Sequence, residues 1–265
     1  MSVSPQVLKV DQARVLVFDT PVELGQAAAA EAVEILRRTV AQRGLARLVV
    51  AGGNSQMELI QALVRTADVP WDAVEVLHMD EYVGIPATHP CSLRLWVKHR
   101  LADVVRPWRM HYLEGDAGDL AAECNRYTGL LQSDALDLCF VGFGENGHIA
   151  FNDPHAADFR DSFWVKMVVL DERCRLQQVG EGHFPDLSSV PPRALTLTCP
   201  ALLGAERIIS CVPDLRKAEA VQRALEGPVS TQCPASIVRT HPGASIYLDR
   251  ESASHLTLAN LETIK

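Results

Sequence analysis

A glycine-rich turn that leads into a histidine is the segment of this chain with the clearest capacity for chemistry. Three glycines fall within residues 142–147, and His148 follows them directly. Glycine permits positive φ angles and lets the backbone approach a ligand closely. Glu145, Asn146 and Asp153 lie only a few residues from the imidazole. A single histidine in a turn is more often a structural residue that bonds a carbonyl, but three polar neighbours favour a functional site.

Two adjacent carboxylates form a second candidate. Asp80 and Glu81 directly follow an apolar run that ends at Met79. In open α/β sheets, ligands bind at the carboxyl ends of the strands, so at least one of these acids should face a ligand. A half-buried carboxylate has a raised pKa and can act as a base near neutral pH. The alternative is that both acids only cap a loop or a helix.

The turn at Gly53, Asn54 and Ser55 joins an apolar run to an expected helix. Backbone N–H groups at such a helix start form a natural anion site, and Ser55 adds a hydroxyl. Alone the pattern is weak, because Ser55 with Glu58 also fits a capping box that has no role in binding.

A second expected helix start carries two cations. Asp214 precedes the helix, and Arg216 and Lys217 fall in its first turn. Cations there oppose the helix dipole, which costs roughly 0.3–1 kcal/mol each unless an anion is bound. Two anion-suited helix starts on one sheet suggest a phosphate. A lysine that extends into water explains the second feature equally well.

Strands and helices alternate along the chain, which indicates parallel strands joined by right-handed crossovers. We therefore predict one doubly wound, mainly parallel sheet flanked by helices, in a single α/β domain over residues 1–265. Strands are expected at 14–18, 48–51, 73–79, 110–113, 135–141, 165–170, 208–212 and 244–248. Helices are expected at 20–42, 55–65, 92–101, 120–132 and 215–225. Residues 151–198 are the least regular and are predicted to form a lid or an inserted lobe.

Composition narrows the class of protein. Hydrophobic residues make up 48% of the 265 residues, which is ample for a core. A net charge of −8 disfavours nucleic-acid binding. The sequence has no apolar run long enough for a membrane helix and shows no secretory signal at its start. Its seven cysteines form no C-x-x-C pair, so we expect reduced thiols in a cytoplasmic protein. Assembly into a homo-oligomer stays open on the sequence.

Several motifs, in order, resemble the glucosamine-6-phosphate deaminase family. The most diagnostic is the segment Gly144-Glu145-Asn146-Gly147-His148-Ile149-Ala150-Phe151-Asn152. The others are Met79-Asp80-Glu81-Tyr82-Val83-Gly84, His89-Pro90 with Ser92, Ala194-Leu195-Thr196, Leu202-Leu203 and Lys217-Ala218. The resemblance runs from about Leu48 to Asp249. The related 6-phosphogluconolactonases share the fold but usually carry Asp-Glu-Arg where this chain has Asp80-Glu81-Tyr82.

The resemblance implies an enzyme that opens a sugar ring, moves a proton from C2 to C1 and releases ammonia. We expect this enzyme to be a hydrolase of amino-sugar metabolism. The substrate would be glucosamine 6-phosphate or a close analogue, the product fructose 6-phosphate, and no metal or organic cofactor would be needed. The implied site residues are Asp80 as base, His148 for ring opening, Asn146 and Asp153 to orient His148, and Gly53, Asn54, Ser55 and Lys217 for phosphate.

Some positions depart from the family pattern. Asp153 stands where better-known members have glutamate, and Asn146 where several have aspartate. Gln178 occupies the position of a second, phosphate-binding arginine, and Arg175, three residues earlier, is a candidate substitute. These departures bear on the identity of the substrate more than on the fold.

Two other functions stay open on the sequence. A sugar-phosphate lactonase would use the same fold. A non-catalytic sugar-phosphate sensor is less favoured, because such sensors normally carry a DNA-binding segment ahead of the domain and only about a dozen residues precede the first expected strand. The presence of both Asp80 and His148 also disfavours a sensor.

Overall fold

The main sheet has nine strands in the described part of the chain and is largely parallel. The computed structural model describes residues 5–257 and 262–263. Along the sheet the strands are β12 (Glu262–Thr263), β1 (Gln6–Val10), β2 (Ala13–Phe18), β11 (Ala244–Asp249), β10 (Arg207–Val212), β7 (Leu138–Val141), β3 (Ala46–Val50), β4 (Val74–His78) and β6 (Arg109–His111). Only β1 pairs antiparallel, with β2 and β12. The predicted doubly wound, mainly parallel sheet is confirmed; β1 was not predicted.

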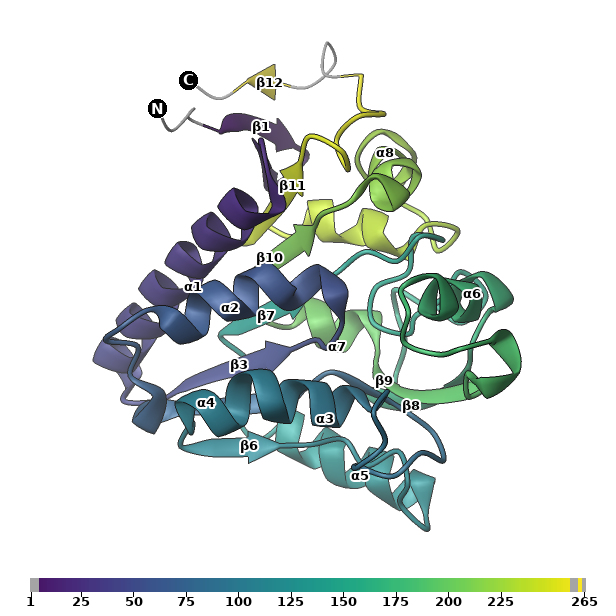
Figure 1. Ribbon diagram of the computed structural model, residues 1–265. Helices are drawn as coiled ribbons and strands as arrows, with labels where there is room; N and C mark the ends of the chain where they lie inside the picture. The colour runs from purple at the N-terminus through teal and green to yellow at the C-terminus, as the bar shows by residue number, and fades with distance from the viewer. Residues whose placement is uncertain (1–4, 258–261, 264–265) are drawn as a thin grey trace.

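Helices cover both faces of this sheet (Figure 1). The α-helices of the described residues are α1 (Pro21–Arg43), α2 (Met57–Arg65), α3 (Leu93–Val97), α4 (Asp103–Val105), α5 (Leu120–Leu131), α6 (Glu172–Gly180), α7 (Cys199–Leu203) and α8 (Ala218–Glu226), of which α6 lies beyond the ends of the strands. Alternate residues of each strand face opposite layers. In β3, Leu48 and Val50 pack against α1 and α2, whereas Val49 packs into the layer that contains α5 and α8.

The long helix α1 shows why the local sequence could be interpreted correctly. The Thr20 side chain accepts a hydrogen bond from the Glu23 N–H, and Glu23 bonds back to the Thr20 backbone, which completes a capping box. Pro21 occupies the first turn, where its missing N–H costs nothing. Gly44 ends the helix at φ +79°, a left-handed conformation that glycine adopts without strain.

A second, antiparallel sheet of three strands was not predicted. It consists of β5 (Asp80–Tyr82), β9 (Arg193–Leu197) and β8 (Val165–Val169), with β9 in the middle. The expectation that the strand at 165–170 pairs in parallel is therefore wrong. The chain leaves the main sheet at Met79, whose carbonyl accepts a hydrogen bond from the Leu197 N–H at 3.1 Å.

The small sheet and α6 lie beyond the carboxyl ends of the main strands (Figure 1). Strands β8 and β9 and helix α6 all belong to the segment that was expected to be a lid or inserted lobe. Whether this segment moves as a lid stays a prediction. Within the described part of the chain, no helix combines the length and apolar character needed to cross a membrane.

Candidate active site

A cavity opens where the carboxyl ends of β10, β7, β3 and β4 lie side by side. The connections from β3 and from β7 run to opposite sides of the sheet, so β3 and β7 flank a topological switch point, where open α/β sheets bind ligands. Each strand contributes the loop that follows it. The residues that line the cavity include Gly53, Asn54, Ser55, Asp80, Gly144, His148, Gln177, Gln178, Glu181, His183 and Lys217.

The Asp80 side chain is buried at the wall of this cavity, with one carboxyl oxygen unsatisfied. Its exposed fraction is 6%, and Oδ1 has no hydrogen-bond partner among the described residues. Burial, followed by the charge of Glu81, raises the pKa of Asp80 to about 8. A carboxyl group in this state has an unusually high proton affinity and can exchange a proton with a ligand near neutral pH.

Glu81 has a different role from its neighbour. Its fully buried carboxylate accepts hydrogen bonds from the Ser92 hydroxyl at 2.6 Å and from the backbone N–H groups of Tyr82, Leu93 and Arg94 at 2.8, 3.1 and 2.9 Å. It is not among the residues that line the cavity. Glu81 therefore fixes β5 to the start of α3, and Asp80 is the acid of this pair that faces the cavity.

His148 is held by residues of its own loop. Its Nδ1 lies 3.1 Å from Oδ1 of Asp153, and its backbone N–H donates to Oδ1 of Asn146 at 3.0 Å. Asn146 Nδ2 also donates to Asp153 at 2.8 Å. Burial alone would raise the pKa of Asp153, but the adjacent imidazole of His148 holds this pKa below the ordinary value. Asn146 and Asp153 thus lie where they can orient the imidazole.

Gly144 is needed for this arrangement because the imidazole lies against its backbone. A Cβ atom at position 144 would fall 2.1 Å from Cε1 of His148. Gly142 allows a similar approach, since a Cβ there would lie 2.7 Å from Oγ of Ser55. These two glycines let the loop after β7 pack against both the histidine and the turn after β3.

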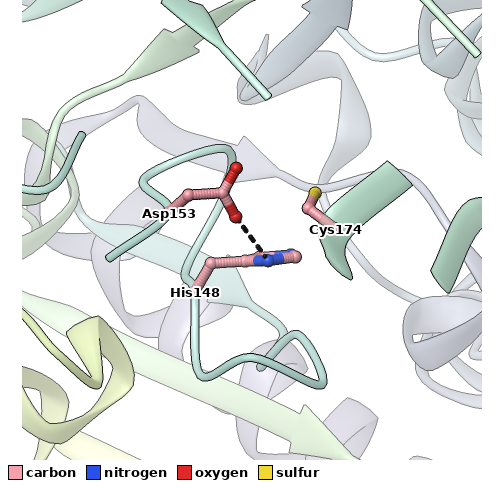
Figure 2. Close-up of side chains that lie close together, drawn as sticks. All are labelled: His148, Asp153 and Cys174. Carbon is pink, nitrogen blue, oxygen red and sulfur yellow. Dashed lines mark ion pairs between the residues drawn. The ribbon is translucent and has the colours of Figure 1, made fainter. Parts of the chain in front are cut away.

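Cys174 completes a cluster around the carboxylate of Asp153 (Figure 2). One ligand-type atom from each of His148, Asp153 and Cys174 lies within 4.8 Å of the other two. Burial, followed by the charges of Asp153 and Asp171, raises the pKa of the thiol well above its usual value. A metal would require the thiolate, so these side chains are better suited to hold Asp153 than to bind an ion.

Lys217 lies at another part of the cavity wall and is already paired. It is 3% exposed, and its Nζ lies 3.0 Å from Oε1 of Glu181. Burial would raise the pKa of Glu181, but His183 and Lys217 lower it to about 2. No sequence pattern pointed to Glu181, His183 or Gln177, because these residues belong to α6 and the turn after it, far from every motif.

The turn after β3 forms the wall beside Lys217. Gly53 adopts φ +108°, and Asn54 Nδ2 donates to the carbonyl of Glu181 at 3.3 Å. Within the described residues, the start of α2 shows no side-chain capping bond, so the capping-box alternative for Ser55 and Glu58 is not what the structure shows. Asp214 does cap its helix, by accepting from the Arg216 N–H at 2.9 Å.

Gln178 and Arg175 have separate environments although both belong to α6. Gln178 lines the cavity, where its Oε1 accepts a hydrogen bond from the Tyr82 hydroxyl at 2.7 Å. Arg175 instead donates to the carbonyl groups of Leu187 and Val190 at 2.6 and 2.9 Å, and it is absent from the cavity lining. Arg175 is thus not placed to substitute for a phosphate-binding arginine.

The family model for glucosamine-6-phosphate isomerases/6-phosphogluconolactonase matches residues 19–247. The chain therefore belongs to this family. It is 33% identical to glucosamine-6-phosphate deaminase 1 of Bacillus subtilis strain 168 over 247 residues, which cover 91% of this chain and 98% of the relative. It is 30% identical to glucosamine-6-phosphate deaminase of Lactobacillus delbrueckii subsp. bulgaricus over 244 residues, covering 92% and 99%.

Two solved structures are also similar to this chain. A structure described as a monomeric glucosamine-6-phosphate deaminase superposes with a TM-score of 0.83 at 31% identity, covering 91% of this chain and 99% of that one. A 6-phosphogluconolactonase from Shewanella baltica OS155 superposes at 0.72 with 20% identity, covering 91% and 97%. The second likeness supports the fold alone.

These comparisons correct one expectation. The expected classification of this protein as a hydrolase is wrong, because the two relatives and the first of the two solved structures described above are named as deaminases. Hydrolysis is the chemistry of the lactonases, with which this chain shares the fold at low identity.

Proposed function

We propose that this protein is an aldose–ketose isomerase and deaminase that acts on an amino-sugar phosphate, with glucosamine 6-phosphate as the first candidate. The observation that carries the proposal is that one cavity combines the unpartnered carboxyl of Asp80, the imidazole of His148 and the ammonium of Lys217. The names and identities of the relatives support the same reaction.

His148 is assigned to opening of the sugar ring. The imidazole can take up or deliver the proton that moves between the ring oxygen and the anomeric hydroxyl, and Asp153 stabilises the protonated ring by its charge 3.1 Å from Nδ1. Because Asn146 and Cys174 both contact Asp153, the carboxylate is held in one orientation.

Asp80 is assigned to proton transfer in the open-chain sugar. As a carboxylate it would remove the proton from C2, and as a carboxylic acid it would return a proton to C1. This transfer leaves an imine at C2, and a water molecule adds to that carbon before the nitrogen leaves as ammonia, so that fructose 6-phosphate remains. A pKa of about 8 suits both directions of transfer near neutral pH. Binding of the phosphate beside Lys217 would fix the sugar relative to Asp80, which makes the transfer effectively intramolecular.

The test is an ammonia-release screen over glucosamine, galactosamine and mannosamine 6-phosphates, with acid release from 6-phosphogluconolactone measured in parallel. We expect ammonia from at least one amino-sugar phosphate, with glucosamine 6-phosphate the preferred substrate, and no acid from the lactone. Acid from the lactone without ammonia from any sugar would identify a lactonase and overturn the proposal.

The compartment is also part of the proposal. All seven cysteines are free thiols in the structure, and five of them are buried. Such thiol usage is typical of a reducing compartment, which supports a cytoplasmic enzyme.

A further inference from the structure

The anion-suited part of the cavity already contains an anion, and it is supplied by the chain itself. Oε1 of Glu181 accepts from Nζ of Lys217 at 3.0 Å and from Nε2 of Gln177 at 2.8 Å. Oε2 lies 3.4 Å from Nε2 of His183. The side chains of Lys217 and Glu181 are only 4% and 8% exposed, so water screens the pair weakly.

This pairing removes most of the positive charge that a phosphate would meet. Among the described residues that line the cavity, Lys217 is the single lysine or arginine. The carboxyl of Glu181 has a pKa of about 2, so it is charged at any pH at which an enzyme is normally assayed. A phosphate dianion beside Lys217 would therefore face an ammonium that is neutralised and a carboxylate that repels it.

Glu181 is placed where it could give way. It follows the last residue of α6, and the next residue, Gly182, adopts φ +78°. The turn is also tied to the opposite wall by Asn54, whose side chain donates to the Glu181 carbonyl at 3.3 Å. A change in the rotamer of Glu181 would release Lys217, Gln177 and His183 together, and these three side chains could then donate to phosphate oxygens.

We propose that Glu181 sets the affinity of the cavity for phosphate, because it competes with the phosphate group of the substrate for Lys217. The proposal takes from the proposed function that the ligand is a phosphorylated sugar. Substrate binding then includes the displacement of Glu181, and the free enzyme holds phosphate more weakly than the same cavity would without this carboxylate. The opposite role is a positioning one, in which Glu181 holds Lys217 in a productive rotamer. The two roles predict effects of opposite sign.

The first experiment measures binding of inorganic phosphate to the full chain by calorimetry. Glu181→Gln keeps the size of the side chain and removes its charge, and we expect the Kd for phosphate to fall about tenfold or more. Glu219→Gln is the matched control, because Glu219 is an exposed acid on the helix that follows Lys217. The control should change Kd by less than twofold. An unchanged or higher Kd in Glu181→Gln would overturn the proposal.

Two further variants keep the result interpretable. Glu181→Ala, which removes every side-chain contact, should also tighten phosphate binding. Lys217→Ala combined with Glu181→Gln should lose the gain, because the ammonium is the group for which the two anions compete. If the double variant retains the tighter binding, phosphate does not compete for Lys217 and the proposal is wrong.

Steady-state kinetics give a second readout. With an amino-sugar phosphate that releases ammonia, Glu181→Gln should lower KM about tenfold and leave kcat within about threefold, whereas loss of a positioning residue would raise KM. If the wild-type protein releases no ammonia from any amino-sugar phosphate, the proposed function fails. The phosphate titration still decides the role of Glu181 in that case.

Discussion

Nδ1 of His148 lies 3.1 Å from Oδ1 of Asp153, whose fully buried carboxylate is placed to orient the imidazole. Asp153 also accepts hydrogen bonds from the Asn146 side chain of the same loop and from the Asp171 N–H, at 2.8 and 2.9 Å. In this protein an aspartate performs the pairing although its side chain is one methylene shorter than the glutamate of the family pattern. The geometry shows that the shorter side chain still reaches the imidazole.

Asp153→Asn should lower kcat for ammonia release about 10²-fold, because the amide keeps the shape but not the charge that supports protonated His148. KM should change little, since Asp153 does not line the cavity. Asp153→Glu is the matched variant and should retain more activity than the asparagine variant, because it keeps the charge. Ammonia release by Asp153→Asn within threefold of wild type would show that the pairing has no role in turnover.

Gly144→Ala should remove most of the activity, because the new Cβ would lie 2.1 Å from Cε1 of His148 and force the imidazole to move. Gly129→Ala is the control. Gly129 is in α5, where an added Cβ meets no atom within 4 Å, so alanine should raise stability by about 0.5–1 kcal/mol. The measurements are kcat and the midpoint of thermal unfolding. Equal activity of both variants would exclude a tight contact between Gly144 and the imidazole.

Glu81→Gln should destabilise the fold by about 2–4 kcal/mol, because an amide oxygen replaces two acceptors and the new NH₂ faces N–H and O–H donors. The four donors come from Tyr82, Ser92, Leu93 and Arg94. The free energy of unfolding in urea gives the answer. Glu34→Gln, at an exposed position of α1, should stay within about 0.5 kcal/mol of wild type. A similarly small effect at position 81 would contradict a structural role.

Asp80 should make stability fall as pH rises. Its pKa is raised from 3.8 to about 8 in the folded protein, so the unfolded chain binds fewer protons between these values. The stability linked to the protonated carboxyl is fully present below pH 3.8 and is lost as pH rises through about 8. Between pH 5 and pH 8, the free energy of unfolding of the wild type should fall by roughly 3 kcal/mol because of this group. Asp80→Asn lacks the ionisable group and should not show this fall. Parallel stability curves for the two proteins would mean that Asp80 has an ordinary pKa.

The main sheet and α1 could be predicted because their signals are local. Thr20, Pro21 and Gly44 mark the ends of α1 within the segment itself, and buried parallel strands are short apolar runs between helices. The small sheet could not be predicted in this way. Its central strand β9 pairs with residues 80–82, more than a hundred positions earlier, and no local pattern encodes such a pairing.

The site also contains some residues that local sequence patterns predict and others that only the tertiary structure brings together. Asp80, His148 and Lys217 stand next to strand ends, so their approach to one cavity follows from the topology. Cys174, Gln177 and Glu181 belong to α6 or its end, and only the packing of α6 over the strand ends brings them to the site. The catalytic and binding roles of these residues stay predictions. The assignment of residues 1–265 to a single domain also stays a prediction.

The central claim is that Asp80 transfers the proton between C2 and C1, and the pH dependence of ammonia release from glucosamine 6-phosphate tests it most directly. Because the base must be ionised, kcat/KM for the wild type should rise as pH increases and level off above about 8. Asp80→Asn should lower kcat by about 10²–10⁴-fold and lose this ionisation. An Asp80→Asn variant that turns over at near the wild-type rate, with the same pH profile, would contradict the account.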